Sequence, residues 1–258
     1  MERYLKIIND TLEEALLCVT RPAVLNDAMK HALLAGGKRI RPVIALAAAE
    51  AVGGDAIDAK YVSCAIELLH NYTLVHDDLP SMDNDTLRRG KPTVWAKYGE
   101  STAILAGDAL QSLAFAMIAK TSEKRPGDLA KILNVFSEKA LGVVCGQVED
   151  LSRNEQSDYD FIYEHKTADL FVAAAQMGAI AGGGSEEDVN AIAEFALNLG
   201  LAFQYEDDLL DGDSPWGREE TVRRVDETTS KACIALKRIN GDTSFLSSLA
   251  NKLIGRTF

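Results

Sequence analysis

Two clusters of aspartates hold the side chains of this sequence that are best suited to chemistry. The first contains Asp77, Asp78, Asp83 and Asp85, and the second is DDLLD at residues 207–211. Each follows an apolar run. Neighbouring buried carboxylates repel one another and lose hydration, so a fold rarely keeps them without a cation. Either cluster alone could be a solvated acidic helix end, but the recurrence argues against that. We predict that the clusters face each other across a cavity, with divalent cations and a diphosphate between them.

The ligand chemistry of the clusters favours magnesium. Asp207 and Asp211 are one helical turn apart and share a face of a helix. Mg²⁺ prefers hard oxygen ligands of this kind and usually shares them with substrate phosphate. Asp77 and Asp83 are too far apart for one face of a straight helix, but Pro80 must end or kink the helix. This break can return Asp83 to the metal side.

A di-iron site is the rival metal interpretation. Glu67 and His70 form the Glu-x-x-His pair of such bundles, but a di-iron site needs two such pairs from two helices. No other histidine has a glutamate three residues before it. We therefore do not expect iron. His70 lies two turns before Asp77, on nearly the same face, and is expected to point into the same cavity.

Six cations suggest an anionic ligand in a strongly acidic chain. The formal net charge is −12, which argues against nucleic acid as a partner. An anion then requires metal ions and a local basic patch that reverse the sign. The sequence GGKRIRP at residues 36–42 combines backbone freedom with cations at a helix start, which favours a phosphate cradle, although a solvated basic turn is the alternative. The six are Lys38, Arg39, Arg41, Arg88, Arg89 and Lys166; Lys166 alone could equally be a half-exposed structural lysine.

The apolar pattern predicts an all-helical chain of about ten helices. The chain has 258 residues, 47% of them apolar, which is enough for a sizeable core, and we expect one domain spanning residues 1–258. No segment shows the alternation of a strand. The predicted helices cover residues 1–19, 24–34, 43–52, 58–79, 102–119, 129–151, 159–181 and 186–211, with one or two more within 228–258.

Composition also predicts the compartment. We expect no membrane span, because we find no run of about 18 apolar residues, and the N-terminus does not resemble a signal peptide. The four cysteines are scattered without paired spacing. We expect them to be reduced core thiols of a cytoplasmic protein.

The motifs together resemble those of the trans-prenyltransferases, the isoprenyl diphosphate synthases of the bacterial farnesyl and geranylgeranyl type. The resemblance spans residues 36–231. It implies an all-helical fold around a deep central cavity, usually a homodimer, that uses three Mg²⁺ to condense isopentenyl diphosphate head to tail with an allylic diphosphate. The matching motifs are GGKRIRP, ELLHNYTLVHDDLPSMDNDTLRRGKPT, ILAGDAL, GQVEDL, HKTADLF, FQYEDDLLD and a trailing Asp226 and Lys231.

The resemblance also implies roles for the matching residues. It places two Mg²⁺ on Asp77 and Asp83 and the third on Asp207, with Asp211 nearby, and leaves Asp78 behind the direct ligands. The residues implied for the allylic diphosphate are Arg88, Lys166 and Lys231. Those implied for isopentenyl diphosphate are Lys38, Arg41, His70 and Arg89. Those implied beside the reacting carbons are Thr167 and Gln204.

The chemistry implied by the resemblance needs no protein nucleophile. Metal ions and cations stabilise the charge on the departing diphosphate, so the allylic C–O bond ionises. Exclusion of water protects the resulting cation. The double bond of isopentenyl diphosphate attacks C1, and in the family's mechanism the departing diphosphate takes the proton.

Tyr72 is the candidate that sets product length. It lies five residues before Asp77 and is expected to point down the cavity below the metals. A tyrosine at this place resembles the short-product members of the family, in which an aromatic ring floors the pocket. We therefore expect C15 farnesyl diphosphate as the product, with C10 and C20 as alternatives. The alternative for Tyr72 itself is an ordinary packed tyrosine with no role in product length.

The sequence departs from the family pattern after residue 211. Counted without gaps, Asp226 and Lys231 fall in place, but Thr221 occupies the usual first lysine and residues 232–233 (AC) replace the usual Thr-Tyr. Relatives also carry longer terminal helices. Nearby arginines that could supply the missing charge are Arg218, Arg223 and Arg224, although an arginine does not simply replace a lysine.

Two further classes of function stay open at this point. The first is a low-activity or non-catalytic subunit that binds prenyl diphosphates in a heteromeric synthase, although such subunits usually lose aspartates that are intact here. The second is a class I terpene cyclase, which would carry an Asn/Ser/Glu metal triad in place of the DDLLD at residues 207–211.

Overall fold

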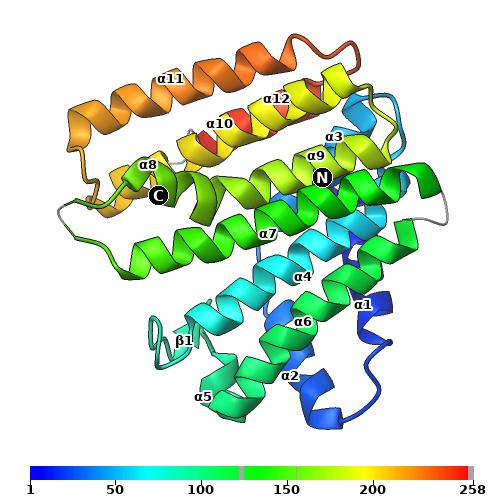
Figure 1. Cartoon of the computed structure of the whole chain (residues 1–258), viewed down its shortest axis with the longest axis vertical. Helices are drawn as coiled ribbons and strands as arrows, with labels where there is room; N and C mark the ends of the chain where they lie inside the picture. Colours follow the sequence, from blue (N-terminus) through cyan, green and yellow to red (C-terminus); the bar gives the residue numbers. More distant parts are fainter. Residues whose placement is uncertain (122–124, 155, 255–258) are drawn as a thin grey trace. The chain divides into compact units, whose positions relative to one another are not determined.

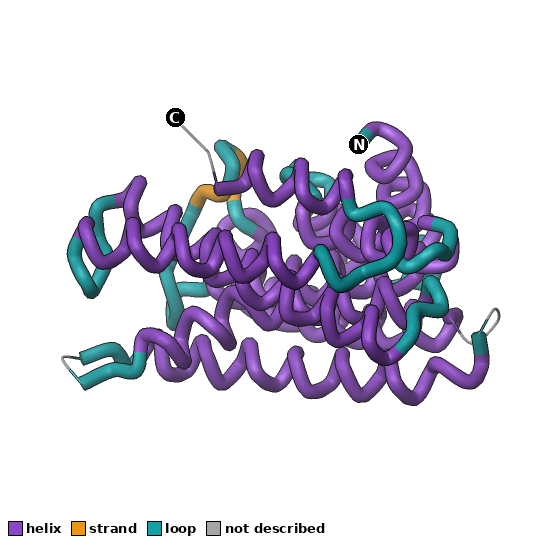
Figure 2. The backbone as a smooth tube through the Cα atoms, turned by 90° about the horizontal axis from the view of Figure 1, so that it is seen from above, coloured by secondary structure: helices purple, strands orange, loops and turns teal. Residues whose placement is uncertain are grey.

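The computed structural model describes residues 1–121, 125–154 and 156–254, and these are almost entirely helical (Figure 1). The sheet found among them is one short antiparallel hairpin, the orange segment of Figure 2. The predicted all-helical class is therefore confirmed. Two compact units make up the chain: unit 1 holds residues 1–43 and 60–129, and unit 2 holds residues 44–59 and 130–258.

Unit 1 is built around α4, which packs against α1, α2 and α6. In Figure 1, α4 (cyan) and α6 (green) run side by side. Helix α1 is amphipathic and buries Ile8, Leu12 and Leu16, as the apolar spacing predicts. The elements of unit 1 are α1 Glu2–Leu16, α2 Ala23–Leu33, α4 Lys60–Asp77, β1 Leu87–Arg88, β2 Lys91–Pro92, α5 Val94–Tyr98 and α6 Glu100–Lys120; α3 Ile40–Ala51 begins here and continues in unit 2.

Helix α6 is long and apolar enough to cross a membrane by length and composition alone, which does not contradict the expectation of no membrane span. The helix has 21 residues. Its most apolar 18-residue window has a mean hydropathy of 1.5, and 44% of that window is buried. A helix packed inside a protein meets the same two criteria. Within unit 1, α6 packs against α2, α4 and α5 through small and aliphatic side chains.

Unit 2 is built around α9 and α10. Helix α9 is buried on every side, and α10 packs against both α9 and α11. Glycines bring α9 close to α3: a Cβ at Gly182 would lie 2.7 Å from the Ala49 carbonyl oxygen, and a Cβ at Gly178 would collide with the Ala45 carbonyl. The elements of unit 2 are η1 Ala56–Ala59, α7 Leu129–Leu151, α8 Tyr159–Ile162, the π-helix η4 Tyr163–Ala168, α9 Asp169–Ala181, α10 Glu186–Asp211, α11 Arg218–Leu236 and α12 Ser244–Ile254; η3 Pro126–Asp128 precedes α7 in unit 1.

Local signals explain the helix boundaries that were predicted correctly. Helix α10 begins after Ser185, whose side chain accepts a hydrogen bond from the Asp188 N–H at 3.1 Å, and ends at Gly212, which has φ 76°. Helix α4 ends at Asp77, two residues before the predicted end at residue 79 and three residues before Pro80. Helix α7 has the predicted bounds, residues 129–151.

Three features differ from the prediction. The segment 159–181 is not one α-helix, because a π-helix occupies residues 163–168. Residues 87–92, where no strand was predicted, form a hairpin whose turn, Arg89-Gly90, has φ of 54° and 74°. Helix α11 begins at Arg218, ten residues before the predicted segment.

The cysteines also differ from the prediction. Cys64 is buried, but Cys18 and Cys145 are exposed and Cys233 is intermediate, so the expectation of four core thiols is wrong. All four thiols are free in the described structure.

Candidate active site

The end of α4 returns Asp83 to the neighbourhood of Asp77. The Asp83 N–H donates to the Asp77 carbonyl at 2.9 Å, and the Leu79 N–H donates to the His76 carbonyl at 3.1 Å. Both bonds form a tight turn that replaces a further helical turn before Pro80. The predicted break at Pro80 therefore brings the first and third aspartates of the motif together along the backbone.

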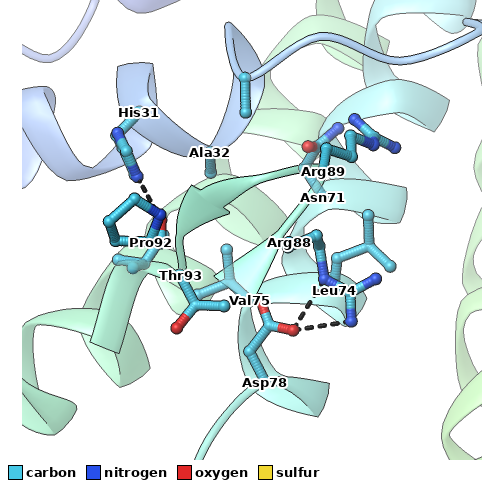
Figure 3. Close-up of a pocket in the computed structure, with 12 residues that line it drawn as sticks. His31, Ala32, Asn71, Leu74, Val75, Asp78, Arg88, Arg89, Pro92 and Thr93 are labelled. Atoms are coloured by element: carbon cyan, nitrogen blue, oxygen red, sulfur yellow. Dashed lines mark hydrogen bonds and ion pairs between the residues drawn. The ribbon is translucent and has the colours of Figure 1, made fainter. Parts of the chain in front are cut away.

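The Asp78 side chain points toward Arg88 of the hairpin (Figure 3). Its Oδ1 accepts hydrogen bonds from Arg88 Nε at 2.7 Å and Nη2 at 2.6 Å. The carboxylate is 3% exposed; burial raises the pKa of Asp78, and Arg88 opposes that shift. Beside it is a cavity of about 30 Å³, room for about two water molecules and no larger ligand.

The four residues implied for isopentenyl diphosphate lie around one pocket of unit 1. This basic pocket has a volume of about 470 Å³. Its remaining lining comes from Gly37, Ile40 and Glu67. Gly37 has φ 141°, a backbone conformation that favours glycine, and the Arg89 guanidinium lies against its Cα. The lining residues predicted from the sequence are Lys38, Arg41, His70 and Arg89.

A buried ion pair, Arg39 with Glu67, lies at the basic pocket, and Glu67 is part of the pocket's lining. The Arg39 guanidinium donates to the Glu67 carboxylate and to the Leu33 carbonyl, and Asn71 Nδ2 donates to Glu67 Oε1 at 3.1 Å. The iron interpretation of Glu67 therefore fails for a physical reason: an arginine engages its carboxylate. Arg39 has φ 51°, and its contacts anchor the loop between Lys38 and Arg41, which both line the pocket.

His70 is neutral in this pocket. Its Nε2 lies 3.5 Å from Arg41 Nη1. Burial lowers the pKa of His70 well below 6.5, and the positive charges of Arg41, Arg89, Arg88 and Arg39 lower it further. A neutral imidazole keeps one acceptor and one donor, so His70 can hydrogen-bond a phosphate oxygen without adding a fifth charge.

Tyr72 lies on α4 and packs edge to face on His76, with ring centroids 4.8 Å apart. Burial raises the pKa of Tyr72, and the nearby charges of Asp108 and Asp77 add to the shift. His76 Nε2 lies 3.0 Å from the Ile104 carbonyl oxygen of α6. Gly107 makes room for this ring, because a Cβ there would collide with the imidazole. Tyr72 is thus held at a close contact of α4 with α6.

In unit 2, the π-helix presents Lys166 and Thr167. Glycines of α7 allow its close approach: a Cβ at Gly146 would collide with the Lys166 backbone nitrogen. The Lys166 ammonium pairs with Asp150 of α7, and its side chain is 35% exposed. A π-helix in this place is typical of a functional segment. Sequence reasoning missed it, because the same residues can wind as an ordinary α-helix.

The second aspartate cluster ends α10. Asp208 is 6% exposed; its Oδ2 accepts from the Tyr163 hydroxyl at 2.6 Å and its Oδ1 from Gln204 Nε2 at 2.9 Å. Gln204 Oε1 accepts from the Thr167 hydroxyl at 2.7 Å. Burial raises the pKa of Asp208, and both donors oppose the shift. Thr167 and Gln204, implied beside the reacting carbons, are therefore brought into contact.

Lys231 is not brought to this end of α10. Arg224 Nη1 meets the Tyr205 hydroxyl at 3.4 Å and Arg238 pairs with Glu194, so α11 runs antiparallel to α10. Lys231 lies midway between those arginines. This puts it level with the middle of α10, about 10 Å along the helix axis from Asp207. The diphosphate role that gapless counting implied for Lys231 therefore stays a prediction, and it finds no support in this placement.

Other residues of the segment after residue 211, which differs from the family pattern, also have partners within the chain. Thr221 is fully buried and its hydroxyl donates to the Gly217 carbonyl at 2.7 Å, so no cation replaces the usual lysine there. Arg223 pairs with Glu220 at 2.6 Å. Arg224 pairs with Asp160 at 2.6 Å and lies 3.9 Å over the Trp216 ring.

The donor set of the two clusters fits magnesium. Among the described residues, no three His, Cys, Asp or Glu side chains converge closely enough to hold a metal ion by themselves. Mg²⁺ does not need such a cage, because it takes one or two carboxylates and completes its shell with water and substrate phosphate. Asp77 with Asp83, and Asp207 with Asp211, each offer such oxygens.

Comparison with known proteins agrees with this chemistry. Residues 22–234 match the Polyprenyl synthetase family. The chain is 44% identical over 213 residues to geranylgeranyl pyrophosphate synthase 7, chloroplastic, of Arabidopsis thaliana, which covers 79% of this chain and 61% of that protein. It is 43% identical over 218 residues to the heterodimeric geranylgeranyl pyrophosphate synthase large subunit 1, chloroplastic, of the same plant, covering 80% and 58%. This chain thus spans about three fifths of the length of these curated relatives.

Solved structures are similar over nearly the whole chain. The geranylgeranyl pyrophosphate synthetase of Pyrococcus horikoshii has a TM-score of 0.88 and 31% identity, with 98% of this chain and 96% of that chain covered. An FPP/GFPP synthase of Zymomonas mobilis has a TM-score of 0.90 and 30% identity, with 98% of each chain covered. Both solved structures are named as prenyl diphosphate synthases, and this chain shares their all-helical fold. The chain belongs to the polyprenyl synthetase family.

Proposed function

We propose that this chain is a trans-prenyltransferase that condenses isopentenyl diphosphate head to tail with an allylic diphosphate. The observation that carries the proposal is the basic pocket: four residues from three separate parts of the sequence line one cavity in a protein of net charge −12. A pocket of this kind focuses a positive potential and fits a diphosphate.

The chain's own residues would bind and orient both substrates. Lys38, Arg41 and Arg89 bind the diphosphate of isopentenyl diphosphate, with neutral His70 as a hydrogen-bonding partner. Arg88 and Lys166 bind the allylic diphosphate, in exchange for part of their pairing with Asp78 and Asp150. Lys231 could join them only if α11 moved, because it lies level with the middle of α10.

The reacting carbons would meet oxygens and not a nucleophile. The Thr167 hydroxyl and the Gln204 carbonyl oxygen present partial negative charge to the allylic carbons as the C–O bond breaks. Mg²⁺, when bound by Asp77, Asp83, Asp207 and Asp211, supplies positive charge that stabilises the departing diphosphate; we expect three ions. This arrangement requires that residues 1–258 act as one domain in which the two clusters face a shared cavity.

The assay that tests the proposal combines purified protein, Mg²⁺, labelled isopentenyl diphosphate and allylic primers of C5, C10 and C15. Incorporation of label into a longer prenyl diphosphate is the expected result. Hydrocarbon formed from a primer alone would indicate a cyclase instead. Asp77→Asn and Asp207→Asn are each expected to lower the rate by about 10²–10³-fold, because each removes stabilisation of developing charge.

We propose C15 farnesyl diphosphate as the main product, although the relatives' names refer to geranylgeranyl diphosphate. The support is Tyr72, a bulky ring fixed against His76 at the contact of α4 with α6. Tyr72→Ala is expected to shift the products toward C20 on a chromatogram, because it removes the floor of the pocket. Tyr61→Ala, a change on the same helix beside Lys60, is the matched control. Identical products from Tyr72→Ala and wild type would contradict the assignment.

We propose a homodimer that works in the cytoplasm. Helix α7 carries a line of exposed apolar side chains at helical spacing, which is typical of a helix that packs on a partner. Leu141→Glu with Val148→Glu should convert a dimer to a monomer in analytical ultracentrifugation; an unchanged sedimentation coefficient would contradict this. Recovery of the protein in an organelle fraction of its own cells would contradict the compartment. The line consists of Leu133, Leu141, Val144, Val148 and Leu151.

A second candidate function is a low-activity or non-catalytic subunit of a heteromeric synthase. The observation that favours it is the segment after residue 211, where Thr221 is buried at the usual lysine position and Lys231 lies away from the aspartates. One of the relatives is named as the large subunit of a heterodimeric synthase. Binding of a prenyl diphosphate without incorporation of label from any primer would support this candidate.

A further inference from the structure

An unbroken line of three hydrogen bonds connects the π-helix with α10 in unit 2. It runs from the Tyr163 hydroxyl to Asp208, from Asp208 to the Gln204 amide, and from that amide to the Thr167 hydroxyl, with lengths of 2.6, 2.9 and 2.7 Å. Tyr163 and Asp208 are each 6% exposed. Water therefore has little access to either end of their bond. Tyr163 has no role in the proposed reaction so far.

The ring of Tyr163 is held in place by other aromatic rings. Its centroid lies 5.4 Å from that of Trp216, 5.7 Å from that of Tyr205 and 6.2 Å from that of Tyr159. Aromatic packing of this kind fixes both the position and the tilt of a ring. The Tyr163 hydroxyl is therefore directed at Asp208 before any ligand binds.

The direction of the bonds fixes which way the Gln204 amide faces. A carboxylate has acceptors only, so the group that Gln204 turns toward Asp208 must be its NH₂. The carbonyl oxygen of Gln204 then faces Thr167 and accepts from its hydroxyl. The reverse orientation would set the amide oxygen against the carboxylate and would aim the NH₂ at the Thr167 side.

We propose that Tyr163 is a positioning residue: through Asp208 it fixes the Gln204 amide with its carbonyl oxygen, and not its NH₂, on the side of Thr167 where the allylic carbons react. The inference rests on the proposed prenyl transfer. Tyr163 itself touches neither substrate. An oxygen near the reacting carbons favours the developing cation, whereas an NH₂ in the same place opposes it.

Removal of the phenol tests this chain of effects. In Tyr163→Phe, one oxygen of a buried carboxylate loses its donor, so Asp208 turns to find another and Gln204 can rotate. We expect kcat to fall about 10- to 100-fold, the effect of a small misplacement of a reacting group, with the KM of both substrates within about twofold of wild type. The matched control is Tyr205→Phe, which removes a hydroxyl from the same aromatic cluster without touching the hydrogen-bonded line; its kcat should stay within about twofold.

A second variant keeps the test independent of any packing change at Tyr163. Asp208→Asn places an amide where the carboxylate was, so it no longer dictates the orientation of Gln204, and kcat should fall by a similar factor. The double variant Tyr163→Phe/Asp208→Asn should be no slower than Asp208→Asn alone, because both changes act through one path.

The outcomes separate the inference from the proposed function. If wild type incorporates isopentenyl diphosphate but Tyr163→Phe is as fast as Tyr205→Phe, the positioning role is overturned and the function stands. The same holds if the two single effects multiply in the double variant, or if Tyr163→Phe raises KM and leaves kcat unchanged. A wild type without incorporation from any primer overturns both.

Discussion

The second aspartate of each cluster is buried, yet the two are stabilised by different means. Asp78 in unit 1 accepts two hydrogen bonds from the charged guanidinium of Arg88. Asp208 in unit 2 accepts from two neutral donors, the Tyr163 hydroxyl and the Gln204 amide. Burial raises the pKa of both carboxyl groups, and in each case the hydrogen-bond donors oppose that shift.

The difference teaches what each region is built to do. In unit 1, fixed positive charges gather around the basic pocket, and burial together with these charges lowers the pKa of His70. This region resembles an anion receptor. In unit 2, the cations near α10 already have partners, Lys166 with Asp150 and Arg224 with Asp160. Its polar groups are arranged as oriented dipoles, which suits a developing positive charge better than a bound anion.

The largest expected effect comes from removal of the charged partner in unit 1. Arg88→Leu leaves the Asp78 carboxylate buried and unpaired, and we expect the free energy of unfolding to fall by about 3 kcal/mol. Urea denaturation followed by circular dichroism measures this. A loss below 1 kcal/mol would mean that water replaces the guanidinium and that the pair is not a buried one.

The second prediction concerns His70 and the pH dependence of the unfolding free energy. Because its pKa in the folded protein is depressed, the folded state binds fewer protons than the unfolded state once the pH falls below 6.5. The stability from neutral His70 is therefore present above pH 6.5 and is lost below it. Between pH 6.5 and 5, the unfolding free energy of wild type should fall by up to about 2 kcal/mol more than that of His70→Gln. Parallel curves for the two proteins would contradict the neutral state of His70.

Removal of a neutral partner in unit 2 should cost less than removal of the charged one. Tyr163→Phe takes one donor from Asp208 and leaves the Gln204 amide in place, so we expect a loss of about 1.5 kcal/mol in unfolding free energy. The same urea titration measures it, with Tyr205→Phe as the control. A loss as large as that of Arg88→Leu would erase the distinction between the two regions.

The smallest effect is expected for a surface ion pair. Arg238 follows the end of α11 and pairs with Glu194 of α10, and both side chains are about half exposed. Solvent screens such a pair, so Arg238→Leu should change the unfolding free energy by less than about 1 kcal/mol. A larger loss would show that the contact fixes the alignment of α11 on α10.

Sequence reasoning predicted the features that depend on local chemistry. Apolar spacing and end signals gave α7 and α10 with their observed bounds. Pro80 correctly indicated the turn that brings Asp83 back to Asp77. The family resemblance brought together the four residues of the basic pocket, which lie too far apart in sequence for any periodicity to connect them.

The features that sequence reasoning missed depend on tertiary contacts or on fine backbone geometry. The pair Arg39 with Glu67 and the bond from Tyr163 to Asp208 join residues 28 and 45 positions apart. The two-residue strands of the hairpin are too short to show alternation. The first turns of α11 are polar, so no apolar stripe indicates their start.

The π-helix has a consequence for how the whole rod from Tyr159 to Ala181 can be altered. Its wider winding holds one residue more than an α-helix of the same rise would, so it acts as a built-in insertion. Deleting one residue within the π-helix would therefore leave a uniform α-helix whose two flanks keep their faces. The same deletion within α9 would turn the residues on one side by about 100° relative to those on the other. Since α9 is enclosed on all sides, that rotation would set the wrong side chains against α3 and α10. The rod should therefore tolerate the loss of a residue at the π-helix better than within α9.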